Sequence, residues 1–216
     1  MSTSSVGIPT MTDNNGQKEW RLNGELHRED GPAIEKVNGD KEWYVNGKLH
    51  RNDGPAVEYS DKPLSEFSME VLKEDGPSYE YVDFVSVNGY KAWYIEGERH
   101  RDDGPAVEYS YGNKELYPYE YNAWYMNGQR HREDGPAYSD AEGDKEWYLH
   151  GELHCEDGPA IEYTDGHKEW YLNGKRHCEA GSAFEDRNGY TAWYLNGERI
   201  TKEEHSSRTI LVKRAI

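Results

Sequence analysis

The sequence predicts an all-β protein, an elongated single-layer solenoid of stacked antiparallel β-hairpins with one short helical insertion. Three observations lead to this fold class. One phrase recurs along the chain, each copy of it holds β-forming runs separated by turn residues, and hydrophobic residues make up only 34% of the total. Repetition at a period of roughly 20–50 residues is typical of repeat architectures, in which each unit is stabilised by its neighbours.

Seven tryptophans mark the copies. They are Trp20, Trp43, Trp93, Trp124, Trp147, Trp170 and Trp193. The step is 23 residues from 20 to 43 and in each of the three steps from 124 to 193, whereas the steps from 43 to 93 and from 93 to 124 are longer. We expect the indoles to stack as the structural core of the array. Because the copies are equivalent, no single copy is expected to form an active centre.

Each copy is predicted to be mostly one β-hairpin. Residues 160–163 and 168–172 are β-rich runs joined through Asp165-Gly166, and Asn173-Gly174 follows them. Asn-Gly and Asp-Gly between such runs indicate tight hairpin turns, because these residues tolerate positive φ. A Gly-Pro-Ala segment such as 158–160 then turns the chain into the next strand.

The chain is expected to divide into three parts. Residues 1–17 show no periodicity and are predicted to be disordered, residues 18–199 form the array, and residues 200–216 form a C-terminal cap in which Ile210-Leu-Val212 covers the last strand edge. The array contains an irregular repeat at 61–90 and a tyrosine-rich insertion at 109–121. Within the irregular repeat, Leu64, Phe67, Val71 and Leu72 have helical spacing, which predicts the short helix.

Composition limits the possible partners. The net charge is −17 and the pI is near 4.9, which argues against direct binding of nucleic acid or of an anionic membrane and favours a basic or amphipathic protein surface. No long apolar run and no export signal are evident, so a cytoplasmic location is expected. The composition leaves the oligomeric state open.

A column of histidines invites a metal or catalytic interpretation. Its members are His27, His50, His100, His131, His154 and His177. Equivalent atoms of neighbouring copies lie about two strand spacings apart, roughly 9–10 Å, so consecutive imidazoles cannot share one ion. We therefore expect a structural role, with each imidazole pinning the loop of its own copy, and we expect no cofactor. The same spacing argues against a Cys155–Cys178 disulfide.

The segment after each histidine carries charged side chains of both signs. An aspartate precedes Gly-Pro in most copies, as Asp134 does, and is interpreted as a turn residue whose carboxylate accepts hydrogen bonds from nearby backbone N–H groups. The arginines that follow the histidines are expected to pair with nearby acids on the surface. They are Arg28, Arg51, Arg101 and Arg132.

A tyrosine follows most of the tryptophans and should face away from its neighbouring indole if the strand alternates. Amphipathic tyrosine is enriched at binding surfaces. Together with the tyrosines of the 109–121 insertion, these residues form the predicted partner-binding surface: Tyr94, Tyr109, Tyr111, Tyr117, Tyr119, Tyr121, Tyr125, Tyr148 and Tyr171.

The unit of tryptophan, Asn-Gly, histidine and a later glycine resembles the MORN repeat family over roughly residues 18–199. In this chain Asn-Gly begins three residues after tryptophan, Arg or Cys follows histidine, and Gly-Pro-Ala replaces Gly-x-Gly. The pattern is similar to the MORN-like variant of bacterial, large-phage and giant-virus proteins. The resemblance implies an elongated β-sheet scaffold that contacts proteins.

Three functional hypotheses stay open at this point. The leading one is a non-enzymatic protein-binding scaffold or inhibitor, because the sequence contains no recognisable catalytic motif. A second is an acidic nucleic-acid mimic, such as a virus-encoded inhibitor of a nucleic-acid-binding defence protein, whose binding should be steeply salt-dependent. A third is a protein that sequesters a small molecule in a pocket within residues 61–121.

Overall fold

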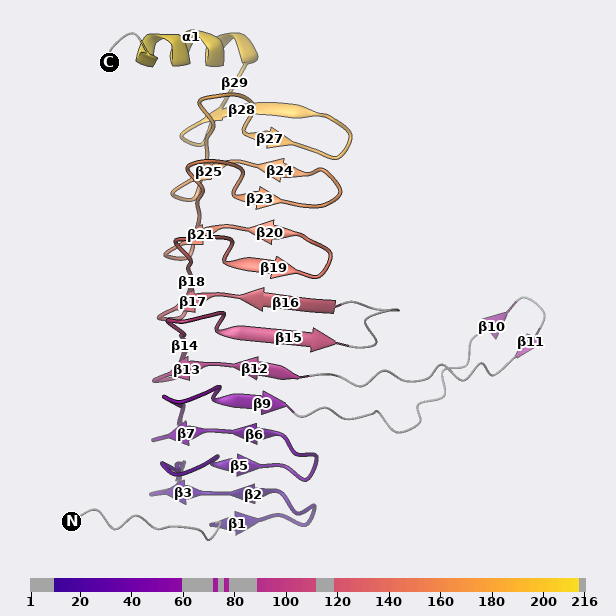
Figure 1. Ribbon diagram of the computed structural model, residues 1–216, viewed down its shortest axis with the longest axis vertical. Coiled ribbons are helices and arrows are strands. Elements are labelled where there is room, and N and C mark those ends of the chain that lie inside the picture. The colour runs from indigo at the N-terminus through magenta and orange to yellow at the C-terminus, as the bar shows by residue number, and fades with distance from the viewer. Residues whose placement is uncertain (1–9, 60–71, 74–75, 78–88, 112–118, 214–216) are drawn as a thin grey trace. The chain divides into compact units, whose positions relative to one another are not determined.

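In the computed structural model, residues 10–59, 72–73, 76–77, 89–111 and 119–213 are described. The chain divides into two units, the first made of Met1–Glu98 with Glu108–Glu120 and the second of Arg99–Val107 with Tyr121–Ile216. Within each unit the described strands form a single-layer antiparallel sheet of stacked hairpins (Figure 1). The predicted all-β repeat fold is therefore confirmed.

About half of the described strands are joined side by side in the long sheet, and we call these the ladder strands. In the first unit they are β1 (Met11–Thr12), β2 (Lys18–Glu19), β5 (Ile34–Glu35), β6 (Lys41–Glu42), β9 (Val57–Tyr59), β12 (Tyr90–Ala92) and β15 (Val107–Tyr111). In the second they are β16 (Tyr119–Ala123), β19 (Tyr138–Asp140), β20 (Lys145–Glu146), β23 (Ile161–Glu162), β24 (Lys168–Glu169), β27 (Phe184–Glu185), β28 (Thr191–Leu195) and β29 (Glu198–Ile200). Val107 of β15 belongs to the second unit, and Tyr119 and Glu120 of β16 belong to the first.

A second, smaller hairpin follows each tryptophan, so a copy holds two hairpins where the sequence predicted mostly one. The pairs are β3 (Arg21–Leu22) with β4 (Glu25–Leu26), β7 (Tyr44–Val45) with β8 (Lys48–Leu49), β13 (Tyr94–Ile95) with β14 (Glu98–Arg99), β17 (Tyr125–Met126) with β18 (Gln129–Arg130), β21 (Tyr148–Leu149) with β22 (Glu152–Leu153), and β25 (Tyr171–Leu172) with β26 (Lys175–Arg176). In the last copy, β28 and β29 make the equivalent turn.

The turns of the small hairpins explain the recurrent Asn-Gly. Asn173 has a φ of 49° and Gly174 a φ of 71°. Two consecutive residues at positive φ define the turn whose twist matches that of paired strands. Glu96 and His150 take the asparagine position at φ values of 52° and 51°, in a conformation that costs such side chains more than it costs asparagine.

Several boundaries differ from those predicted. Residues 10–17 are not disordered, because β1 pairs with β2 and so extends the array toward the N-terminus. Both ends of the predicted insertion at 109–121 belong to ladder strands, because residues 109–111 lie in β15 and residues 119–121 lie in β16. The expected helical insertion lies outside the described residues except at Leu72–Lys73, which form β10 and pair with β11 (Gly76–Pro77). Residues 1–9 and 112–118 also lie outside them.

The C-terminal segment contains the described helix, α1 (Lys202–Lys213). The Oγ1 of Thr201 accepts a hydrogen bond from the backbone N–H of Glu204, and the carboxylate of Glu204 accepts one from the backbone N–H of Thr201, which is a capping box. The imidazole of His205 is buried and donates to the carbonyl of Cys178 at 2.7 Å. A helix anchored in this way stabilises the end of the second unit.

The most deeply buried positions of the array are alanines, not the predicted tryptophans. Ala33, Ala56, Ala106, Ala137, Ala160 and Ala183 are each 0% exposed, whereas among the tryptophans only Trp20 is buried. Tyr138 pairs with Ala123 on one side and with Glu146 on the other, so one residue along the strands Ala137 lies opposite both Trp124 and Trp147. The core of each unit is therefore an alternation of large indoles and small methyl groups.

Candidate functional site

The two faces of the ladder carry different chemistry. Side chains alternate along a strand, so Trp147 points to one face while Glu146 and Tyr148 point to the other. We call the side with the indoles the tryptophan face and the opposite side the tyrosine face. Both faces belong to a single layer, so a half-buried side chain on either one can contact a partner.

On the tryptophan face, each arginine that follows a histidine is held by three groups. In the copies of Arg28, Arg51 and Arg132, the guanidinium carbon lies 4.1 Å from the centroid of the tryptophan eight residues earlier. The Nε donates to the aspartate two residues later at 2.8–2.9 Å, and Nη1 donates to the proline carbonyl at 3.1–3.2 Å. The predicted pairing of arginine with acid is confirmed, and the stacking on tryptophan was not predicted.

In three copies the hydrogen bond and the charge of the arginine lower the pKa of the aspartate two residues later. This applies to Asp53, Asp103 and Asp134. Each of these aspartates therefore pairs with the arginine two residues earlier. The interpretation of the aspartates as turn residues did not include this partner. The glycine that follows lets the guanidinium approach the backbone, because a methyl group on Gly135 would lie 2.9 Å from the guanidinium carbon of Arg132 and would displace it.

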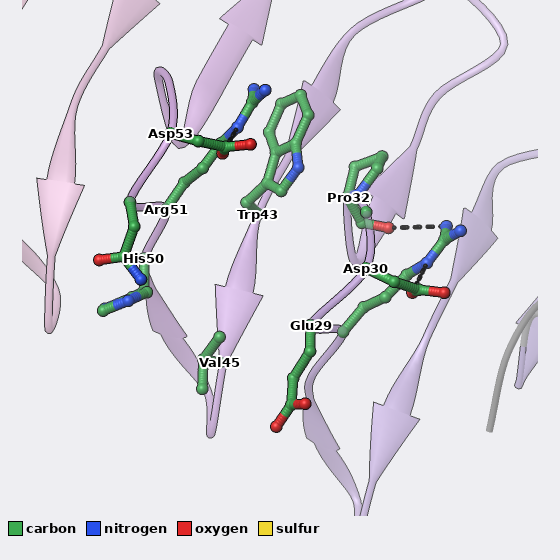
Figure 2. Close-up of a pocket in the computed structure, with 11 residues that line it drawn as sticks. Glu29, Asp30, Pro32, Trp43, Val45, His50, Arg51 and Asp53 are labelled. Carbon is green, nitrogen blue, oxygen red and sulfur yellow. Dashed lines mark hydrogen bonds and ion pairs between the residues drawn. The ribbon is translucent and has the colours of Figure 1, made fainter. Parts of the chain in front are cut away.

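Consecutive copies enclose a groove on the tryptophan face. Between the loops at 28–32 and 50–53 the groove has a volume of about 750 Å³, with Trp43 and Val45 also lining it. Figure 2 shows the Trp43 indole between the two loops, with the Arg51 side chain beside it. An equivalent groove of about 430 Å³ lies in the second unit, where Trp170 and Leu172 replace Trp43 and Val45 and both arginines are cysteines.

The histidines connect one copy to the next. The backbone N–H of Asn46 donates to Nδ1 of His27 at 3.1 Å, and that of Asn173 donates to Nδ1 of His154 at 3.2 Å. The same bond recurs at His50, His100, His131 and His177. The expected bond to the loop of the same copy occurs at His100, whose Nε2 lies 3.0 Å from Oδ1 of Asp102, whereas the bond that each imidazole makes with the turn of the following copy was not predicted. This bond orders the strained turn and joins the copies.

On the tyrosine face, carboxylates lie among the rings. Tyr148 and Tyr163 both donate to the carboxylate of Glu146, at 3.0 and 3.1 Å. Tyr171 donates to Glu169 at 2.7 Å, and Arg176 donates to the same carboxylate at 2.7 Å. Each hydroxyl bond fixes its ring, so these half-buried tyrosines are held in one orientation. These glutamates were not among the predicted site residues, although the Glu-x-Tyr spacing places both side chains on one face.

The rings also contact one another and the arginines. Tyr121 and Tyr138 have centroids 5.9 Å apart, and the guanidinium carbon of Arg130 lies 5.3 Å from Tyr138 and 5.2 Å from Tyr148. Burial and the neighbouring carboxylates raise the pKa values of Tyr44, Tyr138 and Tyr163 to about 12. These phenols therefore stay protonated donors at neutral pH.

The structure brings together part of the predicted partner-binding set. The second unit places Tyr121, Tyr125, Tyr148 and Tyr171 on its tyrosine face, all half-buried, and Tyr94 and Tyr109 are half-buried in the first unit. Tyr111 and Tyr119 belong to β15 and β16, and Tyr117 lies outside the described residues. Most of the region predicted to hold a small-molecule pocket also lies outside them.

Glu169 gives a pH-dependence that can be measured. Burial alone would raise the pKa of its carboxyl, but hydrogen bonds from Tyr171, Arg176 and His167 outweigh burial and leave that pKa below 4.5. A carboxyl whose pKa is lowered by folding stabilises the protein above its unfolded pKa. We therefore expect the free energy of unfolding to fall as the pH drops from about 5 to about 3.

Urea unfolding of the wild type and of Glu169→Gln across this pH range measures the effect. The variant should be less stable at pH 7 and should lose less stability on acidification. An unchanged pH slope in the variant would contradict the assignment.

No protein-family model matches the sequence, and comparison with curated proteins gives no match. The described part of the chain contains no helix long and apolar enough to cross a bilayer. Among the same residues, no three histidine, cysteine, aspartate or glutamate side chains are grouped so that they could hold a metal ion. Both cysteines are free thiols.

Proposed function

We propose that this chain is a non-enzymatic repeat scaffold that binds another protein on its tyrosine face. The observation that carries the proposal is the set of half-buried tyrosines whose hydroxyls are fixed by Glu146 and Glu169. Rigid aromatic side chains offer a large contact area at a small cost in conformational entropy, and interfaces are enriched in tyrosine and arginine. The MORN-like resemblance supports the same role.

The exposed edge of this face adds to the argument. Tyr59 is 40% exposed and Tyr190 is 52% exposed, one in each unit. The guanidinium of Arg176 lies within 5.8 Å of the rings of Tyr171, Phe184 and Tyr194. A surface on which arginine and tyrosine alternate suits a partner with mixed apolar and polar groups.

The test is affinity capture with the wild type and with a double variant, Tyr148→Ala with Tyr171→Ala. A partner of the tyrosine face should stay bound at about 0.5 M salt, where exposed charges are screened, and should be lost with the double variant. The matched control is Glu133→Gln with Glu156→Gln, which changes exposed carboxylates of the loops and should retain the partner. A partner held equally by the wild type and the tyrosine variant would contradict the proposal.

One observation supports the alternative hypothesis that the chain is a nucleic-acid mimic. The loop carboxylates of Asp53, Asp103 and Asp134 are 84–85% exposed and recur with the repeat. If this surface carried the function, the same capture would give the opposite pattern. Binding would then disappear at high salt, weaken in the loop variant, which removes two carboxylates from these loops, and survive in the tyrosine variant.

A further inference from the structure

On the tryptophan face, the chain binds the guanidinium groups of its own arginines in one recurring geometry. In the copy of Arg132, the guanidinium lies over Trp124, donates to the carboxylate of Asp134 at 2.8 Å and donates to the carbonyl of Pro136 at 3.2 Å. The copies of Arg28 and Arg51 repeat this geometry. We call the space occupied by the guanidinium the guanidinium slot.

In the next copy the arginine is replaced while the rest of the slot is kept. Cys155 stands at the arginine position, and Trp147, Asp157 and Pro159 stand where Trp124, Asp134 and Pro136 stand one copy earlier. Glu162 also takes the place of Glu58, which accepts a bond from Arg51 at 2.9 Å. The copy therefore keeps every group that contacts the guanidinium in other copies and lacks only the arginine side chain.

The glycines show that the shorter cysteine leaves the slot open. A methyl group on Gly135 would lie 2.9 Å from the guanidinium carbon of Arg132, but on Gly158 its nearest neighbour would be Sγ of Cys155 at 4.0 Å. Cys155, Asp157 and Gly158 also line the groove of about 430 Å³ between the copies of Cys155 and Cys178, in which the lining indole is that of Trp170. A side chain from outside can enter where the arginine side chain runs in other copies.

The charges around the slot favour a cation. Within the described part of the second unit, no cation lies over Trp147 and no basic side chain pairs with Asp157, whereas Arg132 serves both purposes one copy earlier. Glu156 is 82% exposed at the rim, 3.8 Å from the imidazole of His154. Glu162 shares its charge with Lys168 at 3.3 Å. Asp157 is therefore an uncompensated carboxylate at the position that receives the guanidinium in the copy of Arg132.

We propose that the Cys155 slot binds the arginine side chain of a separate polypeptide. A guanidinium can stack on the Trp147 indole while its N–H groups reach Asp157 and the Pro159 carbonyl, as Arg132 does in its own copy. An ammonium can make the cation–π contact but cannot match this planar set of acceptors. The slot lies opposite the tyrosine face and does not depend on the role proposed for that face.

The neighbouring copy provides an internal comparison. Cys178 also replaces the arginine there, beside Trp170, but Ala180 stands where Asp157 stands and Ser182 where Pro159 stands. That copy offers an indole without the carboxylate. An arginine side chain should therefore prefer the slot at Trp147 over the one at Trp170 by at least tenfold.

The experiment titrates N-acetyl-arginine N-methylamide into the full chain labelled on its tryptophan indoles. The indole N–H signal of Trp147 should shift and saturate with a Kd on the order of 1–10 mM, as expected for one charged contact. The neutral, equally shaped citrulline derivative should bind at least tenfold more weakly, and the lysine derivative several-fold more weakly. No shift at Trp147, or an equal shift at Trp170, would overturn the proposal.

Substitutions at the slot separate binding from general attraction to an acidic chain. Cys155→Arg should fill the slot from within and abolish the response of Trp147, while the matched variant Cys155→Ser should keep it. The remaining indole signals report whether the variants fold. Asp157→Asn gives a second test that does not refill the slot, and it should weaken binding at least fivefold. Unchanged binding in Cys155→Arg or in Asp157→Asn would overturn the assignment.

Discussion

Trp147→Ala is expected to lower the free energy of unfolding by about 3 kcal/mol, the lower part of the range for truncating a core aromatic residue. Trp147 lies in the middle of the second unit, with Ala137 and Ala160 as its neighbours across the strands. Removing the indole uncovers both alanines, which are fully buried in the wild type. Neither neighbour is large enough to fill the space.

Chemical denaturation monitored by circular dichroism measures this loss, and Trp193→Ala is the matched control. Trp193 lies in β28 at the end of the ladder, where only one neighbouring copy depends on it and Lys202 of α1 lies 5.7 Å from its ring. In a stack of nearest-neighbour contacts, the terminal substitution should mainly unfold the last copy. Equal global losses from both substitutions would contradict a stack of this kind.

The repeat and its turns could be predicted because they depend on local chemistry. Asn173-Gly174 adopts the two positive φ values that its residue types favour, and the same dipeptide predicts the same turn in other copies. The strands that follow Gly-Pro-Ala were also predictable from their β-forming residues. Predicting these features does not require knowing which side chains lie opposite one another on neighbouring strands.

The core could not be predicted in the same way, because it depends on register. A large indole such as Trp147 suggests deep burial, yet a single layer has no second sheet to cover it, and the small Ala137 between two indoles is buried instead. The contact of His154 with the turn at Asn173 is likewise set by how copies stack. Sequence spacing within one copy contains no information about the following copy.

The candidate sites show the same limit. The sequence paired Arg132 with an acid correctly, because Asp134 is only two residues away. It did not show that the pair is stacked on Trp124, eight residues earlier, since that contact needs the small hairpin to fold back on the ladder strand. Comparing copies position by position, with Cys155 against Arg132, is the step that connects the sequence to the guanidinium slot.

Ala137→Leu is expected to destabilise the protein by about 2–3 kcal/mol, at the upper end of the usual cost of overpacking. Ala137 is 0% exposed and lies opposite Trp124 and Trp147, both of which are held within hydrogen-bonded copies. Three additional carbon atoms would force the indoles apart or push the strand β19 out of register. Backbone bonds such as that from Trp124 to the carbonyl of Ala137, at 2.7 Å, resist both movements.

The same chemical change at Ala141, in the exposed turn after β19, is the matched control and should alter stability by less than about 0.5 kcal/mol. Thermal and urea unfolding of the two variants measure the difference. If Ala137→Leu were as stable as Ala141→Leu, the indoles would have room to move, and the alternation of indole and methyl group could not be what determines the spacing of the copies. A large loss confined to Ala137 would instead explain why an alanine ends the Gly-Pro-Ala segment in these copies.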